Sequence, residues 1–174
     1  MTAMELLVTR QALDMIERGV KEGQRDDLEH GGSLLALEDG DRTLVAYALP
    51  TGPAAQQGPA RVRTDAGFQN AAIARIRRAW PALAYVGDWH VHPMWLPQLS
   101  GTDRHTAARI LAGEAAHRRH LVLLLGTAPP QGDAVVLGFR AWAGAGALAR
   151  VEAVSVRPVD DDGPEVLEAL GEPL

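Results

Sequence analysis

The stretch LVLLLGT, residues 121–127, has almost no polar positions. Such a run is typical of a strand that is buried on both faces, so we predict it at the centre of a sheet. Outward from it, alternation and turn residues predict further strands over residues 6–9, 31–37, 42–49, 82–92, 134–142 and 149–156. The turn at residues 38–41 makes the second and third of these a hairpin.

Apolar residues at helical spacing predict helices among these strands. They cover residues 12–23, 68–80 and 102–112, with a short terminal helix at 166–170. Residues 50–64 are rich in Pro, Gly, Ala and Gln without an apolar period, which predicts a surface loop. The fold class we expect is α/β: a single-domain twisted mixed β-sheet flanked by helices, spanning residues 1–160, with a short acidic C-terminal tail at 161–174.

Composition excludes several classes of function. The chain of 174 residues is 47% hydrophobic, as expected for one compact domain. Its 17 basic and 22 acidic residues include no long basic run, so we expect no nucleic-acid partner. It has no cysteine, which excludes disulfides, thiolate zinc sites and a cysteine nucleophile. No apolar run has signal-peptide or membrane-spanning character, so we expect a cytoplasmic protein with no membrane partner.

The segment DWHVHPMWLPQLSGTD, residues 88–103, contains candidate metal ligands. Residues two apart on a strand face the same side, so His90 and His92 share one face. Because Pro93 cannot donate to a sheet ladder, we expect the strand to end there, with both imidazoles at the rim of the sheet.

Asp103 follows at the start of a predicted helix, where its alternative role is a helix cap. The intervening loop, stiffened by Pro93 and Pro97, is long enough to return this carboxylate to the two imidazoles. Two neutral His nitrogens and one carboxylate make a three-ligand zinc site with a fourth position open for water, as in catalytic zinc. We therefore predict Zn²⁺ as the cofactor.

Hydrolysis at such a site also needs a base that takes a proton and returns it to the leaving amine. Glu29 is the best candidate because it stands just before a predicted strand, and Glu22 and Glu38 are its rivals. Gly31 would permit close approach of backbone or substrate.

Two further residues of the 88–103 segment each have two readings. The hydroxyl of Ser100 could stabilise an oxyanion or hold a water, or Ser100 could only start the helix. Trp95 could line a groove for substrate or merely cover the loop.

In these residues the chain resembles the JAB/MPN metalloproteases, whose JAMM signature is a glutamate on an early strand, then His-x-His, then ten residues and an aspartate. Proline often follows the second histidine, and serine often stands three residues before the aspartate. The matching residues here are Glu29, His90, His92, Pro93, Ser100 and Asp103. The likeness in element order covers roughly residues 5 to 145.

The resemblance implies a mixed sheet between helices, similar to the cytidine-deaminase-like architecture, and one catalytic zinc. It implies hydrolysis of a peptide or isopeptide bond after the C-terminal glycine of ubiquitin or a ubiquitin-like protein, with Glu29 as general acid/base. Compact chains of this kind resemble the bacterial branch, whose relatives occur beside activating-enzyme and conjugating-enzyme homologues, including in antiphage defence. The expected partner is therefore a ubiquitin-like protein substrate.

Two features depart from the pattern or leave it open. His30 stands where relatives often have a small residue, so a further imidazole near the metal or a changed substrate contact is one reading. The chain also has neither the cysteines nor the length of linkage-selective members.

Two other functions remain open: a JAB hydrolase that releases a small product from a carrier-protein C-terminus, and a non-catalytic MPN-type binding scaffold. A zinc deaminase and a serine hydrolase are disfavoured, because the chain has no Cys-x-x-Cys and no Gly-x-Ser-x-Gly. We expect no ligand role for His105, His117 or His120.

Overall fold

The computed structural model describes residues 5–144 and 146–174, so the first four residues of the predicted domain lie outside the described residues. The elements follow the chain in this order: β1 (Glu5–Thr9), α1 (Arg10–Asp26), β2 (Gly31–Asp39), β3 (Arg42–Ala48), β4 (Gln56–Gly58), β5 (Arg61–Arg63), α2 (Ala66–Ala79), β6 (Ala84–Val91), α3 (Gly101–Ala112), β7 (Leu121–Thr127), β8 (Val135–Trp142), β9 (Arg150–Val159) and α4 (Pro164–Leu170).

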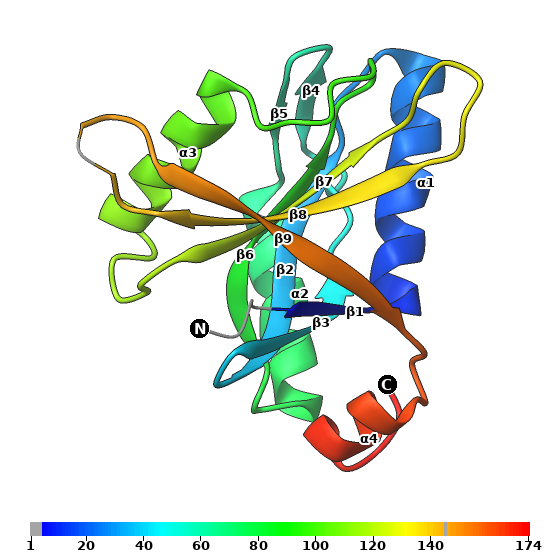
Figure 1. The fold of residues 1–174 in the computed structure, drawn as a ribbon, viewed down its shortest axis with the longest axis vertical. Coiled ribbons are helices and arrows are strands. Elements are labelled where there is room, and N and C mark those ends of the chain that lie inside the picture. The colour runs from blue at the N-terminus through cyan, green and yellow to red at the C-terminus, as the bar shows by residue number, and fades with distance from the viewer. Residues whose placement is uncertain (1–4, 145) are drawn as a thin grey trace.

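Strands of the described residues close into a barrel in the order β1-β3-β2-β6-β7-β8-β9, with both parallel and antiparallel pairs (Figure 1). Strand β1 closes it, since Glu5 pairs in parallel with Arg42 of β3 and with Ser155 of β9. The expected sheet flanked by helices is therefore wrong. Hydrophobic alternation tells which face of a strand is buried, but not which strand lies beside it, and this closure joins the two ends of the chain.

The largely apolar strand β7 is buried throughout, as predicted, and lies between β6 and β8. The predicted position at the centre of a sheet does not apply, because a closed barrel has neither a centre nor an edge; the position of β7 is given by its neighbours β6 and β8. Strand β6 bends where the pairing with β2 changes register, between Leu34 and Leu35. Gly87 stands at this bend with φ 153°, and any Cβ there would collide with the backbone of Val122.

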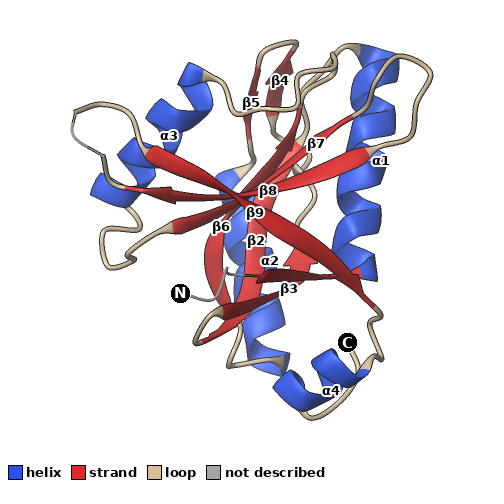
Figure 2. Cartoon of the chain, viewed as in Figure 1, coloured by secondary structure: helices blue, strands red, loops and turns tan. Residues whose placement is uncertain are grey.

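Helix α1 packs against β3, β6 and β7 on one side of the barrel, while α3 lies on the opposite side, against β8 (Figure 2). The prediction that α1 ends at Gly23 is wrong, because it continues to Asp26 and Asp27 caps it in the left-handed region. Gly23 serves close packing instead: a Cβ there would lie 2.7 Å from the carbonyl oxygen of Leu28 and 3.2 Å from Val91 Cγ2.

The sequence predicts an irregular surface loop over residues 50–64, but these residues contain the two-stranded sheet β4–β5. Helix α2 is confirmed, and Arg75, Arg77 and Arg78 are exposed on it as expected for a solvated face. The acidic tail carries α4, whose Val166 packs with Leu7 of β1. No helix in the described part of the chain is both long and apolar enough to cross a bilayer.

Candidate metal centre

The two histidines lie at the end of β6, as the sequence predicts. His90 pairs with Gly31 of β2 and with Leu125 of β7, so it lies between two neighbouring strands. The strand ends at Val91, and the N–H of His92 continues the ladder for one more bond by donating to the carbonyl of Gly126 (2.9 Å). Both imidazoles therefore project from backbone that is held on the barrel.

Asp103 reaches the site from the first turn of α3. The backbone N–H of Ser100 donates to Asp103 Oδ2 (2.6 Å), and the N–H of Asp103 donates to Ser100 Oγ (3.2 Å). This reciprocal capping box fixes the start of the helix and the orientation of the carboxylate together. The helix-cap role and the ligand role of Asp103 are thus compatible, because the cap hydrogen bond uses Oδ2 and leaves Oδ1 facing His90 Nε2.

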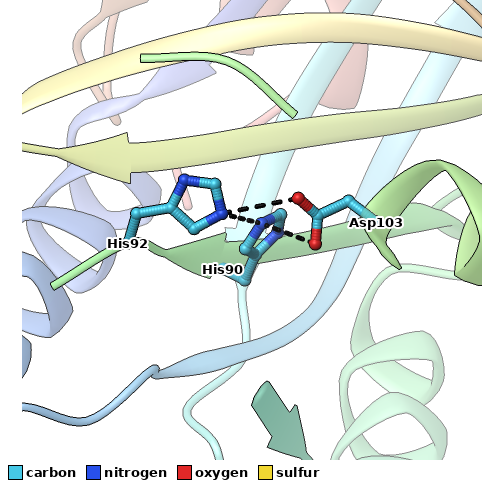
Figure 3. Close-up of side chains that lie close together, drawn as sticks. All are labelled: His90, His92 and Asp103. Carbon is cyan, nitrogen blue, oxygen red and sulfur yellow. Dashed lines mark hydrogen bonds and ion pairs between the residues drawn. The ribbon is translucent and has the colours of Figure 1, made fainter. Parts of the chain in front are cut away.

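The three side chains converge on one point (Figure 3). His90 Nε2 lies 3.2 Å from His92 Nε2 and 3.3 Å from Asp103 Oδ1, and His92 Nε2 lies 3.4 Å from Asp103 Oδ2. Ligand atoms about 2.0 Å from a tetrahedral zinc ion are about 3.3 Å from one another. The residues therefore fit a zinc ion, and within residues 5–144 and 146–174 they are the only such group of His, Asp or Glu.

The ring of His92 is oriented by a hydrogen bond on its far side. Its Nδ1 lies 3.0 Å from the carbonyl oxygen of Leu96, which can only accept, so Nδ1 carries the hydrogen and donates. In the neutral ring the lone pair is then on Nε2, the atom that a metal would bind, whereas only the doubly protonated ring also donates from Nε2 to Asp103. A histidine that ligates a metal commonly donates its other ring N–H in this way.

The electrostatics of the centre favour a charged carboxylate beside the imidazoles. Burial alone would raise the pKa of Asp103, but hydrogen bonds from His90 and His92 outweigh it and hold this pKa well below its usual range. Burial lowers the pKa of His92, yet its bonds to Asp103 and to the Leu96 carbonyl outweigh burial and raise it overall. The negative charge that a divalent cation needs is therefore already present.

Glu29 is buried near the metal ligands. The Val91 N–H donates to the carbonyl of His30 (2.9 Å), and this continuation of the β2–β6 register places Glu29 opposite His92. Burial raises the pKa of Glu29, although His90 and His92 lie close enough to oppose the shift. Such a carboxyl, poised above its usual pKa beside a cation site, is suited to exchanging protons.

The β4–β5 hairpin holds Glu29 by its backbone. The Glu29 N–H donates to the carbonyl of Gly58 (2.9 Å), and Gln57 Nε2 donates to the carbonyl of Glu29 (2.9 Å). This contact was missed because residues 50–64 look like an irregular loop. The signal in the sequence for this contact is Gln57, a polar side chain just before the turn that joins β4 to β5.

Gly31 lies beside the centre as the strand partner of His90. A Cβ on Gly31 would lie 2.6 Å from the carbonyl oxygen of Trp89 and 3.2 Å from Val62 Cγ1, so glycine permits the close approach of β2 to β6 and to the hairpin. Trp95 is 44% exposed, on the segment that joins His92 to α3.

His30 does not join the centre. Its side chain turns to α1, where Nδ1 is 3.9 Å from Glu22 Oε2, so the reading of a further imidazole near the metal is not supported. This contact also draws the rival base Glu22 away from the ligands, and the other rival, Glu38, pairs with Arg118 (2.6 Å) and His120 (3.3 Å).

The remaining histidine with a described contact, His105, approaches the backbone carbonyl of Ala147 through Nδ1 (3.0 Å) and is exposed. It is not part of the group formed by the candidate ligands.

Comparison with known proteins gives one relative in sequence and a similar fold. No family model matches the chain. Over 103 residues, 58% of the chain, it is 32% identical to a Pseudomonas aeruginosa protein named CD-NTase/cGAS isopeptidase, and the match spans 64% of that protein's length. The solution structure of a Desulfitobacterium hafniense protein has a TM-score of 0.64 at 19% identity, covering 89% of this chain and 93% of that one. This second likeness shows a shared fold.

Proposed function

We propose that the protein is a zinc-dependent isopeptidase of the JAMM type. The observation that carries the proposal is the triangle of His90, His92 and Asp103, whose ligand atoms have the spacing of a tetrahedral zinc site. The similarity to a protein named an isopeptidase supports the reaction class. The buried Glu29 beside the triangle supports hydrolysis over mere metal storage.

His90, His92 and Asp103 would hold the ion. When bound, zinc lowers the pKa of a coordinated water to about 7 and polarises a carbonyl oxygen. The protein's own contribution is to keep the three ligands in place through β6 and the capping box of α3, with His92 in the tautomer that presents Nε2.

Glu29 moves the proton. Its carboxylate accepts a proton from the attacking water as the water oxygen forms a bond to the carbonyl carbon of the isopeptide. Glu29 then donates that proton to the nitrogen of the leaving lysine amine as the C–N bond breaks, which returns the glutamate to its starting state. The raised pKa of Glu29 makes the first transfer easier, because a carboxylate with a higher pKa is a stronger base toward the water proton.

Ser100 stabilises the oxyanion in this proposal. Its oxygen accepts from the Asp103 N–H, and a hydroxyl has one hydrogen besides its acceptor sites, so that hydrogen is available to the substrate. In this proposal the substrate tail passes Gly31, which allows close packing of the strand beside His90, and Trp95, which offers an exposed apolar face.

The substrate we propose is a conjugate in which a C-terminal carboxyl is joined to an amine of another protein. A ubiquitin-like protein ending in glycine is one source of that carboxyl. The relative's name suggests a second source, a CD-NTase or cGAS-like enzyme that is itself conjugated, in the setting of antiphage defence. Both share an extended C-terminal tail that would lie across Gly31 and Trp95.

Mass spectrometry of the cleavage products tests the proposal. Zinc-loaded protein is incubated with a ubiquitin-like isopeptide conjugate and with a CD-NTase conjugate. We expect Glu29→Gln to lower kcat/KM by about 10²- to 10⁴-fold, because it removes the acid/base group, while the zinc content stays at the wild-type level. The matched control is Glu22→Gln, since Glu22 lies on α1 beside His30 and should leave kcat/KM unchanged.

Two results would contradict the proposal and favour the other functions. Wild-type protein that trims a small group from a carrier tail but cleaves no folded conjugate would be a JAB hydrolase of small products. Protein that takes up no zinc after supplementation would be a binding scaffold.

A further inference from the structure

A single buried hydroxyl organises the segment that follows His92. Thr127, the last residue of β7, is fully buried. Its Oγ1 accepts from the N–H of Leu96 (3.4 Å) and is within donating distance of the carbonyl oxygens of Met94 (3.2 Å) and His92 (3.4 Å). These bonds are long, so the segment depends on the set of three and not on any one of them.

Apolar burial does not hold this segment. Residues 94–98 are all exposed and lie outside helices and strands, with Met94 77% exposed and Leu96 38% exposed. A loop without buried side chains has little hydrophobic energy to define its conformation. The hydroxyl of Thr127 is therefore the inner anchor on which these backbone groups converge.

The anchored peptide is the one that orients a metal ligand. Leu96 donates its N–H to Thr127 and accepts the Nδ1–H of His92 on its carbonyl oxygen. A shift of this residue moves the acceptor that selects the tautomer and the ring angle of His92. Thr127 thereby acts on Nε2 of His92 through two hydrogen bonds, although its own side chain is not part of the ligand group.

We propose that Thr127 is a positioning residue for the metal centre: its hydroxyl fixes residues 92–96 so that the Leu96 carbonyl holds His92 in its metal-binding orientation. The inference rests on the proposed zinc site. It adds a residue from a strand that carries no ligand.

Zinc affinity of the purified full-length chain tests the proposal, measured by competition with a chromophoric chelator. Thr127→Val keeps the shape and removes the hydroxyl, and we expect it to weaken zinc binding about 10- to 100-fold, as loss of an outer partner of a ligand does. Thr127→Ser keeps the hydroxyl and should restore most of the affinity. Thr43→Val, at an equally buried threonine of β3, is the matched control and should bind zinc as the wild type does.

A second readout separates positioning from a general loss of stability. At one zinc concentration, the zinc-induced rise in Tm increases with the logarithm of the affinity for the folded state, so Thr127→Val should show a smaller rise than Thr43→Val. In wild-type protein, amide hydrogen exchange at Leu96 should be slower than at Trp95 and Gln98, because only Leu96 donates inward. The exchange measurement needs no variant and holds even if Thr127→Val does not fold.

Equal zinc affinity of Thr127→Val and wild type would overturn the inference, as would exchange at Leu96 as fast as at Trp95 and Gln98. Either result leaves the zinc site itself intact. Wild-type protein that binds no zinc would instead remove the proposed function, so the two failures can be told apart.

Discussion

Trp89 and Val91 turn one face of β6 toward α1, whereas His90 turns the other toward Asp103 at the start of α3. The first face is apolar and buried: Trp89 is 2% exposed, and a Cβ on Gly19 of α1 would lie 2.8 Å from its ring. The second face carries only polar side chains near the rim. Alternation along one strand thus lets packing against α1 fix the backbone from which the candidate metal ligands project.

Two carboxyls near the polar face add a second contrast. Burial raises the pKa of Asp88 to about 6, although Tyr85 donates to it (3.0 Å). Asp103 is half-buried, but hydrogen bonds from two imidazoles move its pKa in the opposite direction. The neighbours of each carboxyl, not its burial alone, decide whether it is charged in the folded protein.

The largest expected effect is a loss of zinc affinity on the polar face. One substitution on each face of β6 tests whether the two faces have different roles. We expect His92→Ala to weaken zinc binding by more than about 100-fold, since losing a ligand should cost more than losing one of its outer partners. Val91→Ala, one residue away on the apolar face, should lower the free energy of unfolding by about 2 kcal/mol and leave zinc affinity near wild type. Chelator competition and urea unfolding measure the two quantities. Equal loss of zinc affinity in both variants would contradict the division into faces.

On the apolar face, Trp89→Ala should lower the free energy of unfolding of the zinc-free protein by about 3–5 kcal/mol, because it opens a cavity against α1. It also leaves the Leu49 carbonyl without the indole N–H that donates to it (2.8 Å). Trp89→Phe is the control that restores much of the volume without the donor. Urea unfolding gives both values, and a loss below about 1 kcal/mol for Trp89→Ala would mean that α1 does not hold β6 in place.

The smallest effect concerns Asp88 and pH. Its pKa is higher in the folded than in the unfolded chain, so its contribution to stability is complete below pH 4 and is lost as pH rises through about 6. The shift corresponds to at most about 3 kcal/mol, and to less because the carboxyl is only partly buried and solvent screens it. Asp88→Asn should remove this dependence. The free energy of unfolding of the zinc-free protein, measured from pH 4 to 8, should decline in the wild type and change less in Asp88→Asn. Identical pH profiles of the two proteins would contradict this role of Asp88.

Much of the candidate site could be predicted because its residues lie in local patterns. The His-x-His spacing on a strand, the proline after it and a helix start at Ser100 are short-range features, and the structure brings His90, His92 and Asp103 together as that spacing indicates. The roles of Glu29 and Ser100 in catalysis stay predictions. The orientation of His30 could not be predicted, because it depends on where α1 lies.

Near-neighbour patterns in the sequence predict the helices and barrel strands apart from the end of α1, the buried character of β7 and the placement of two imidazoles on one face, because hydrophobic period and strand alternation act over a few residues. Only the tertiary structure decided that β1 joins β3 to β9 and closes the barrel, that the β4–β5 hairpin grips Glu29, and that Thr127 anchors the segment after His92. Each of these contacts has a backbone group as at least one of its partners and joins segments that are separated in the chain. Every residue except proline carries both backbone hydrogen-bonding groups, so the residue types do not tell which backbone group a distant strand or side chain will meet.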